Sequence, residues 1–312
     1  MDRSSCRAWS RPRKSRGPAC LFDAKTHVSV PLLNFHVETR PAMWRRGNEA
    51  GFRNWRSCII LDDRALGEAV DASFVDAFRR LAHRESGLVA RFGSVEVAAM
   101  GLPVGFLNPI FALESLYAPD DLAEALAVVR GRKLPFVVHI RGSLGEGSVS
   151  VARELGLKQT AVLPGMALPL PATAPAGPEG LRVQRNVDTP AYAAGLAVAA
   201  EGFGMPLPLA EVAFPQSMFD DNGIRGYVAY VDEEPVATAT SIQLGSVLGI
   251  YNVATVPTRR RSGYGAAVTW RAIEDADPAT SAVVLQSSPD GIPVYERMGF
   301  RTVVEYLEFE PA

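Results

Sequence analysis

The most informative stretch of this chain is Arg259-Arg260-Arg261-Ser262-Gly263-Tyr264-Gly265-Ala266. It follows an apolar run at residues 248–256 and precedes a helical pattern. The sequence therefore predicts a buried strand that ends at Pro257, a basic turn, and a helix that opens at about Gly263.

The predicted turn suits a phosphate or pyrophosphate group. Successive backbone N–H groups at a helix start point outward, with the positive end of the helix dipole behind them. Gly263 and Gly265 carry no side chain to block a ligand, and Arg260 and Arg261 add positive charge beside it. An anion site between this strand and this helix is therefore expected.

The chain beyond the turn continues with a second strand and a short helix. An apolar strand at 282–285 is followed by a helix that carries Tyr295, then by a Gly-Phe pair and a last strand at 302–309. Over residues 182–310 this order resembles the Gcn5-related N-acetyltransferase (GNAT) family. The resemblance implies an α/β fold, here as two tandem GNAT-like domains, in which the glycine loop holds the pyrophosphate of acetyl-CoA.

The resemblance also implies which residues touch acetyl-CoA. The strand at 252–255 would diverge from the strand at 282–286, and the pantetheine arm would lie in the gap and pair with the backbone of Val253 and Thr255. Tyr295 takes the family position of the residue that protonates the CoA thiolate. The implied acetyl-CoA-binding residues are Val253, Ala254, Thr255, Arg260, Arg261, Ser262, Gly263, Tyr264, Gly265, Ala266 and Ser288.

Some positions depart from the family pattern. Ser288 stands where many members have an asparagine that contacts the pantetheine, and Gly291 stands where alanine is usual. No carboxylate occurs between Glu234 and Glu274, so the glutamate that often serves as general base is missing. Tyr295 has a second interpretation, as an aromatic side chain packed in the core. The base stays open among Tyr251, a water held by Asn252, Glu211 and bulk solvent.

Residues 61–170 repeat the order of elements without the anion loop. Strands are expected at 89–97, 104–113, 135–140 and 159–168, and helices at 120–130 and 148–155. The turn after Leu113 lacks an Arg-x-x-Gly-x-Gly pattern. We therefore expect a degenerate GNAT-like domain that does not hold CoA in the usual way. A proline-rich linker at 171–180 would join it to an acetyl-CoA-binding domain at 181–312.

Composition limits the partners of this chain of 312 residues. No apolar run reaches the length of a membrane span, so no membrane partner is expected. Residues 1–60 are basic but lack the basic helix or aromatic platform of nucleic-acid binding, so no nucleic acid is expected. This segment is expected to be a dispensable disordered arm, or translated upstream sequence ahead of a start such as Met43.

The cysteines give no sign of a disulfide framework or a metal site. Cys6, Cys20 and Cys58 are odd in number and have no CxxC spacing. No metal is therefore expected, and a reducing cytoplasm fits this composition.

These features predict an N-acetyltransferase that moves an acetyl group directly from acetyl-CoA to the amine of a small molecule or peptide. The alternative is a non-catalytic acyl-CoA-binding or scaffolding protein with the same fold. Turnover with a panel of amines distinguishes the two. A homodimer remains open as an oligomeric state.

Overall fold

The computed structural model describes residues 62–83, 86–114 and 117–312. All of them belong to one unit that begins at Ser57. The predicted arm at 1–60, with the alternative start at Met43, lies outside the described residues.

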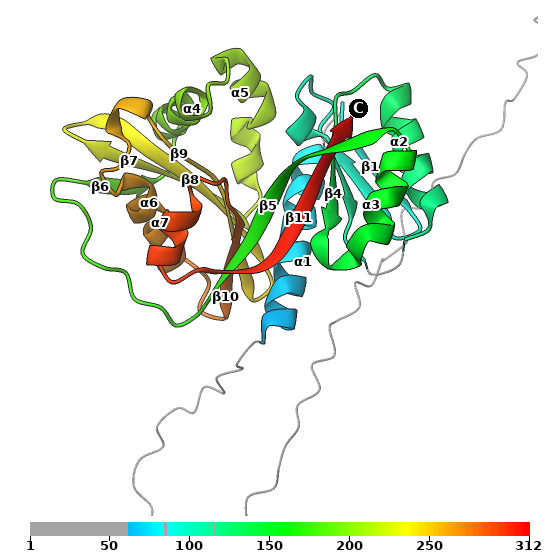
Figure 1. The fold of residues 1–312 in the computed structure, drawn as a ribbon. Coiled ribbons are helices and arrows are strands. Elements are labelled where there is room, and N and C mark those ends of the chain that lie inside the picture. Colours follow the sequence, from blue (N-terminus) through cyan, green and yellow to red (C-terminus); the bar gives the residue numbers. More distant parts are fainter. Residues whose placement is uncertain (1–61, 84–85, 115–116) are drawn as a thin grey trace, which may run out of the picture. The chain divides into compact units, whose positions relative to one another are not determined.

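The described residues form one mixed sheet of eleven strands flanked by helices, which confirms the predicted α/β class (Figure 1). The strands are β1 (Leu88–Phe92), β2 (Val95–Ala99), β3 (Pro109–Ala112), β4 (Val137–Arg141), β5 (Leu157–Pro169), β6 (Arg182–Arg185), β7 (Ile224–Val231), β8 (Glu234–Leu244), β9 (Val247–Thr255), β10 (Ala282–Gln286) and β11 (Arg301–Pro311). The helices are α1 (Asp63–Ala82), α2 (Pro119–Gly131), α3 (Gly145–Glu154), α4 (Thr189–Phe203), α5 (Leu207–Ala213), α6 (Tyr264–Glu274) and α7 (Ile292–Arg297). Short 3-10 turns are η1 (Gly105–Leu107), η2 (Gly142–Leu144), η3 (Gln216–Asp220) and η4 (Pro257–Arg259). The strand order is β1-β2-β3-β4-β11-β5-β10-β9-β8-β7-β6.

The two halves of the chain exchange their last strands. β5, the last strand of the first half, pairs with β10 on one edge and with β11 on the other. β11, the last strand of the chain, pairs with β4 of the first half. Figure 1 shows β5 and β11 running side by side through the middle of the sheet. Each half therefore completes the sheet of the other, while the linker at 171–180 and the domain boundaries stay a prediction.

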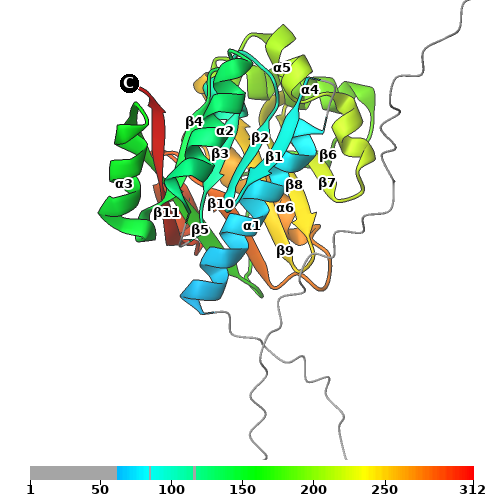
Figure 2. The ribbon, with the colours of Figure 1, turned by 90° about the vertical axis from the view of Figure 1, so that its right-hand side faces the viewer.

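Helix α1 lies across these exchanged strands on one face of the sheet (Figure 2). Its apolar stripe includes the buried residues Val70 and Phe74. The stripe packs in one core with Ala167 of β5, Val284 of β10 and Tyr306 of β11. A helix of the first half thus shares its core with strands of the second half.

Strand β9 is covered on both faces. Leu248 and Ile250 pack with Val268 of α6 in one core. Tyr251 alternates with them and turns toward α1, where its hydroxyl oxygen lies 2.8 Å from Ser73 Oγ. The two helices that cover β9 therefore come from different halves of the chain.

The prediction of one strand at 89–97 is wrong, because these residues form the β1–β2 hairpin. β1 ends at Phe92, β2 begins at Val95, and Gly93 in the turn has φ +52. Glycine adopts this backbone region without strain, and a two-residue turn joins antiparallel strands readily. The predicted strand at 104–113 is also shortened, because η1 occupies its start.

Two kinds of feature are absent from the described part of the chain. Among residues 62–83, 86–114 and 117–312, no three His, Cys, Asp or Glu side chains gather as a metal-binding group. No single helix in these ranges is long and apolar enough to cross a membrane. Helix α4 and the segment Leu207–Asp220 meet that condition only together, as a pair bent by 116°.

Gly165 lies where β5, β11 and α1 meet. A Cβ at this position would lie 2.5 Å from Val304 Cγ1 and 2.8 Å from Val70 Cγ1. Gly165→Ala should therefore lower the free energy of unfolding by about 1–3 kcal/mol, the usual cost of overpacking a core. Urea unfolding measures the change. Gly177→Ala is the control, since a Cβ there meets nothing within 4 Å, and equal stability of the two variants would contradict the prediction.

Asp71 ties α1 to strands β4 and β11. Its Oδ1 accepts a hydrogen bond from the Tyr306 hydroxyl at 2.7 Å, and its Oδ2 lies 2.9 Å from Nη1 of Arg141. Burial raises the pKa of the Asp71 carboxyl to about 6, while the hydrogen bond and the guanidinium act in the opposite direction. The carboxyl therefore changes its charge near pH 6.

Replacing Asp71 with Asn should remove one pH dependence of stability. Between about pH 4 and pH 6 the folded chain holds the Asp71 proton and the unfolded chain does not, so the parent loses stability as the pH rises through this window. Relative to the Asp71→Asn variant, the parent should lose up to about 3 kcal/mol of its free energy of unfolding, and this loss should level off above pH 6. Urea unfolding of both proteins from about pH 4 to 8 gives the difference, in which shared groups such as buried His139 cancel. A difference that does not vary with pH would show that burial leaves this carboxyl unperturbed.

Candidate functional site

The parallel strands β9 and β10 separate partway along their length. Their pairing ends at Gly249↔Val284. β9 continues to Thr255, and over this part the described sheet pairs it on one edge only, with β8. The divergence that the family resemblance implied is thus confirmed, and β9 presents unpaired backbone toward the gap.

A β-bulge lies in β9 beside this split. The register of β8 and β9 shifts between Thr238↔Ala254 and Thr240↔Tyr251. Asn252, inside the shift, has φ +52. Bulges bend a strand and re-aim its side chains, and they are over-represented next to active sites.

Helices α4 and α6 hold the end of β9 from opposite sides. A Cβ at Gly265 of α6 would lie 3.3 Å from Thr255 Oγ1 and 3.9 Å from Val253 Cγ1. A Cβ at Gly202 of α4 would lie 2.8 Å from the Cβ of Ala254. The three residues predicted to line the pantetheine arm are therefore held by glycines that let both helices approach closely.

The turn before α6 leaves a row of backbone N–H groups without backbone partners. Ala267 N donates to Gly263 O at 3.0 Å, but within the described chain the N–H groups of residues 261–266 donate to no backbone carbonyl. Arg261 and Gly263 have φ values of +64 and +81 on either side of Ser262. This alternation lets successive N–H groups converge on one anion.

The N-terminus of α6 also lacks a capping side chain. Asp62 caps α1 and Asp188 caps α4, each with a carboxylate that accepts a backbone N–H. Helix α6 instead begins at Gly263 and has no acidic residue in its first turn. The described chain therefore supplies no anion at the positive end of this helix, and a phosphate group fits there.

The three consecutive arginines have different surroundings. Arg259 forms an ion pair with Glu234 at 2.8 Å. Arg260 donates from Nη2 to Gly202 O at 2.7 Å, in the last turn of α4, and so braces the loop. Arg261 is exposed, and neither Arg260 nor Arg261 forms an ion pair with any described residue, so no carboxylate of the described chain neutralises these two charges.

Ser288 and Tyr295 follow β10 on the other side of the split. The carbonyl of Ser288 accepts from Gly291 N at 2.9 Å and from Ile292 N at 3.2 Å, which starts α7. The ring of Tyr295 lies edge-on to Phe300, with the ring centroids 5.7 Å apart. Burial raises the pKa of Tyr295 to about 12, so its hydroxyl keeps its proton at neutral pH.

Glycine at position 291 has a steric reason. A Cβ there would lie 2.7 Å from Ser287 Oγ and 3.2 Å from Cε2 of Tyr295. The departure from alanine therefore lets the Tyr295 ring pack close to the end of β10. The Tyr295 hydroxyl has no hydrogen-bond partner among the described residues, so nothing in them satisfies it locally.

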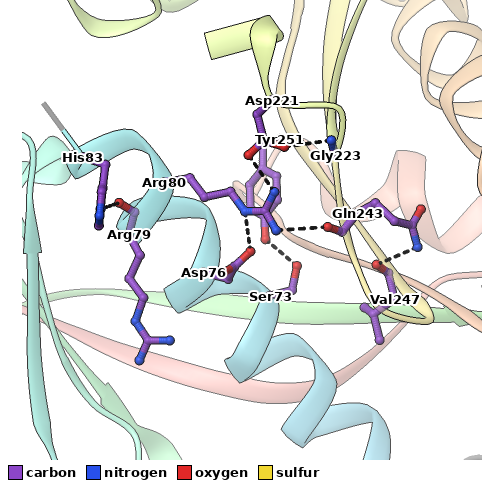
Figure 3. Close-up of polar contacts among 10 residues, drawn as sticks. All are labelled: Ser73, Asp76, Arg79, Arg80, His83, Asp221, Gly223, Gln243, Val247 and Tyr251. Carbon is purple, nitrogen blue, oxygen red and sulfur yellow. Dashed lines mark hydrogen bonds and ion pairs between the residues drawn. The ribbon is translucent and has the colours of Figure 1, made fainter. Parts of the chain in front are cut away.

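Tyr251, one of the candidate bases, contacts the first half of the chain (Figure 3). Its hydroxyl shares a hydrogen bond with Ser73 of α1, and burial raises its pKa above the usual range. A phenol that resists ionisation is a poor proton acceptor. No sequence pattern indicated Ser73 as its partner, since the two residues are 178 positions apart.

Arg80 fixes the same helix against the second half (Figure 3). Its guanidinium contacts Asp76 at 2.7 Å, Asp221 at 2.9 Å and the carbonyl of Gln243 at 3.2 Å. Ser73 therefore contacts Tyr251 from a helix that Arg80 anchors about two turns further along.

The corresponding helix start in the first half has its own anion. In α2 the carboxylate of Asp121 accepts from Ala118 N at 3.3 Å and from Ser94 N at 3.4 Å. β3 and β4 pair up to Ala112↔Ile140, at the end of β3. The described first half therefore has neither a strand split of this kind nor an uncapped helix start there.

The comparisons with known proteins agree with this geometry. Residues 199–300, which run from α4 through α7, match the family model described as the acetyltransferase (GNAT) family. No curated protein matches the chain. The chain thus carries an α/β domain of the acetyltransferase class at 199–300, and that domain belongs to the GNAT family.

Solved structures extend the likeness of fold beyond that domain. A GCN5-related N-acetyltransferase from Kribbella flavida is 18% identical, with a TM-score of 0.61, and the match covers 78% of this chain and 95% of that one. A GCN5-related N-acetyltransferase from Sphaerobacter thermophilus is 15% identical, with a TM-score of 0.51, and the match covers 69% of this chain and 76% of that one. Both halves of the described chain therefore fall within a GNAT-type architecture.

Proposed function

We propose that this protein transfers an acetyl group from acetyl-CoA to an amine of a small molecule or peptide in the cytoplasm. The observation that carries the proposal is the row of N–H groups at residues 261–266, which have no backbone partner and lie at the start of an uncapped helix. The pyrophosphate of acetyl-CoA would accept from them. The split between β9 and β10 supports the same placement, since it begins at Gly249 and the unpaired end of β9, at Thr255, leads into this loop.

The pantetheine arm would lie along the open edge of β9. Val253 and Thr255 would pair with it through their backbones, in the manner of an added strand. The side chains of Val253 and Thr255 lie close to Gly265 in the first turn of α6. Because the proposed contacts use only backbone groups, these side chains need not move. Ala254 and the loop residues Arg260, Ser262, Tyr264 and Ala266 would then line the path from the thioester to the phosphates.

Direct transfer requires two proton movements. The amine nitrogen attacks the thioester carbonyl carbon, the carbon–sulfur bond breaks, and the thiolate takes a proton. Tyr295 is the proposed donor, because its hydroxyl is protonated at neutral pH and has no other partner among the described residues. The amine's proton passes to a water held near Asn252, to Glu211 or to bulk solvent. Tyr251 is the weakest candidate, because its hydroxyl is buried against Ser73.

Gly263→Asp should weaken acetyl-CoA binding by more than about tenfold, since a carboxylate would take the place of the phosphates on the N–H groups. Calorimetry with acetyl-CoA measures the affinity. Gly245→Asp is the matched control, because Gly245 also has a positive φ, +55, and a Cβ there meets nothing within 4 Å. Equal affinities of the two folded variants would contradict the proposed site.

Tyr295→Phe should leave acetyl-CoA affinity nearly unchanged and lower turnover by about a hundredfold or more, the usual loss when a general acid is removed. The ring still packs on Phe300, and only the hydroxyl is lost. Release of free CoA with an amine panel measures turnover, with Tyr230→Phe on β7 as the control. Unchanged turnover, with chemistry shown to be rate-limiting, would indicate that water and not Tyr295 protonates the thiolate. Binding without turnover for any amine would instead favour an acyl-CoA-binding protein.

A further inference from the structure

A cavity lies where β4 of the first half and β11 of the second half separate. Their pairing ends at Arg141↔Tyr306, and beyond it residues 302–305 of β11 pair only with β5. The space that opens has a volume of about 280 Å³. It is lined by Arg141, Gly142, Ser143, Thr302, Val303, Val304 and Glu305.

Arg141 gives the cavity a fixed cation with an unused donor. Its Nη1 lies 2.9 Å from Asp71 Oδ2, and the other oxygen of Asp71 is taken by Tyr306. Gly67 makes room for the guanidinium, since a Cβ there would lie 2.8 Å from Nη2. The Nε–H of Arg141 is buried and has no acceptor among the described residues. A buried charged donor without an acceptor raises the free energy of the folded protein. An oxygen acceptor at the guanidinium would therefore be stabilising.

Glu305 gives the same cavity an unpaired anion. It is exposed, lines the cavity, and forms no ion pair with any described residue. Arg141 is committed to Asp71, so the two cavity charges do not neutralise each other. The hydroxyls of Ser143 and Thr302 add neutral hydrogen-bonding groups to the lining of the cavity.

We propose that this cavity binds a small zwitterion of the amino-acid type, with its carboxylate on Arg141 and its ammonium on Glu305. The planar guanidinium suits a carboxylate, and a carboxylate side chain suits an ammonium. A volume of about 280 Å³ lies at the small end of ligand pockets, which fits a free amino acid better than a peptide. The strand order places β11, β5 and β10 between this cavity and the β9–β10 split, so it is a second site and does not depend on acetyl transfer.

Calorimetric titration of the full chain with each standard amino acid, without acetyl-CoA, tests the proposal. At least one amino acid should bind saturably. Its N-acetyl derivative, which lacks the ammonium, and its decarboxylated amine should each bind about tenfold more weakly or worse, because each loses one charge-assisted contact. No saturable binding of any amino acid, or equal binding of the N-acetyl derivative, would overturn the proposal.

Two variants place the binding in this cavity. Glu305→Gln removes the anion from an exposed position, and Ser143→Trp fills the space without changing a charge. Each should weaken binding by about tenfold or more. Glu310→Gln makes the same charge change on an exposed residue of β11 outside the cavity and should bind like the parent. Binding that is unaffected by both cavity variants would assign the amino acid to another site and overturn the proposal.

Discussion

Strands β5 and β11 and helix α1 approach one another closely at Gly165. Any side chain at this position would run into Val304 and Val70. β5 belongs to the first half but completes the sheet of the second, and β11 does the reverse. The contact therefore holds the exchange of strands together, and with it the single sheet formed by both halves.

The exchange explains how β9 and β10 separate without loss of the sheet. A parallel strand that leaves its neighbour gives up backbone hydrogen bonds, which is costly when the strand is buried. β10 keeps a partner along its whole length, because β5 pairs with it from Ala282↔Pro169 to Gln286↔Gly165. β9 keeps β8 in the same way. The gap at the candidate site is thus supported from one side by a strand of the first half.

Local features of the second half were predictable because they depend on neighbours in sequence. Helix α6 starts next to Gly263, as the sequence predicted, and Asp188 caps α4 by the same kind of local contact within a few positions of the helix start. No local sequence pattern predicted the exchange of β5 and β11, because the packing of the whole sheet determines which distant strands pair. For the same reason no local pattern indicated that Arg260 would also donate to Gly202 O at the end of α4. The Ser73–Tyr251 contact could not be predicted from the sequence for the same reason.

The two openings in the sheet present different kinds of unpaired polar group. At the split of the second half the free groups are backbone N–H donors, because Gly263 and the lack of an acidic first turn leave α6 uncapped. At the start of α2 in the first half, the carboxylate of Asp121 accepts from Ala118 N and Ser94 N and supplies negative charge of its own. The other opening lies between β4 and β11. Its free groups are the side chains of Arg141 and Glu305. Backbone donors favour a polyanion, whereas opposed side-chain charges favour a ligand that carries both signs.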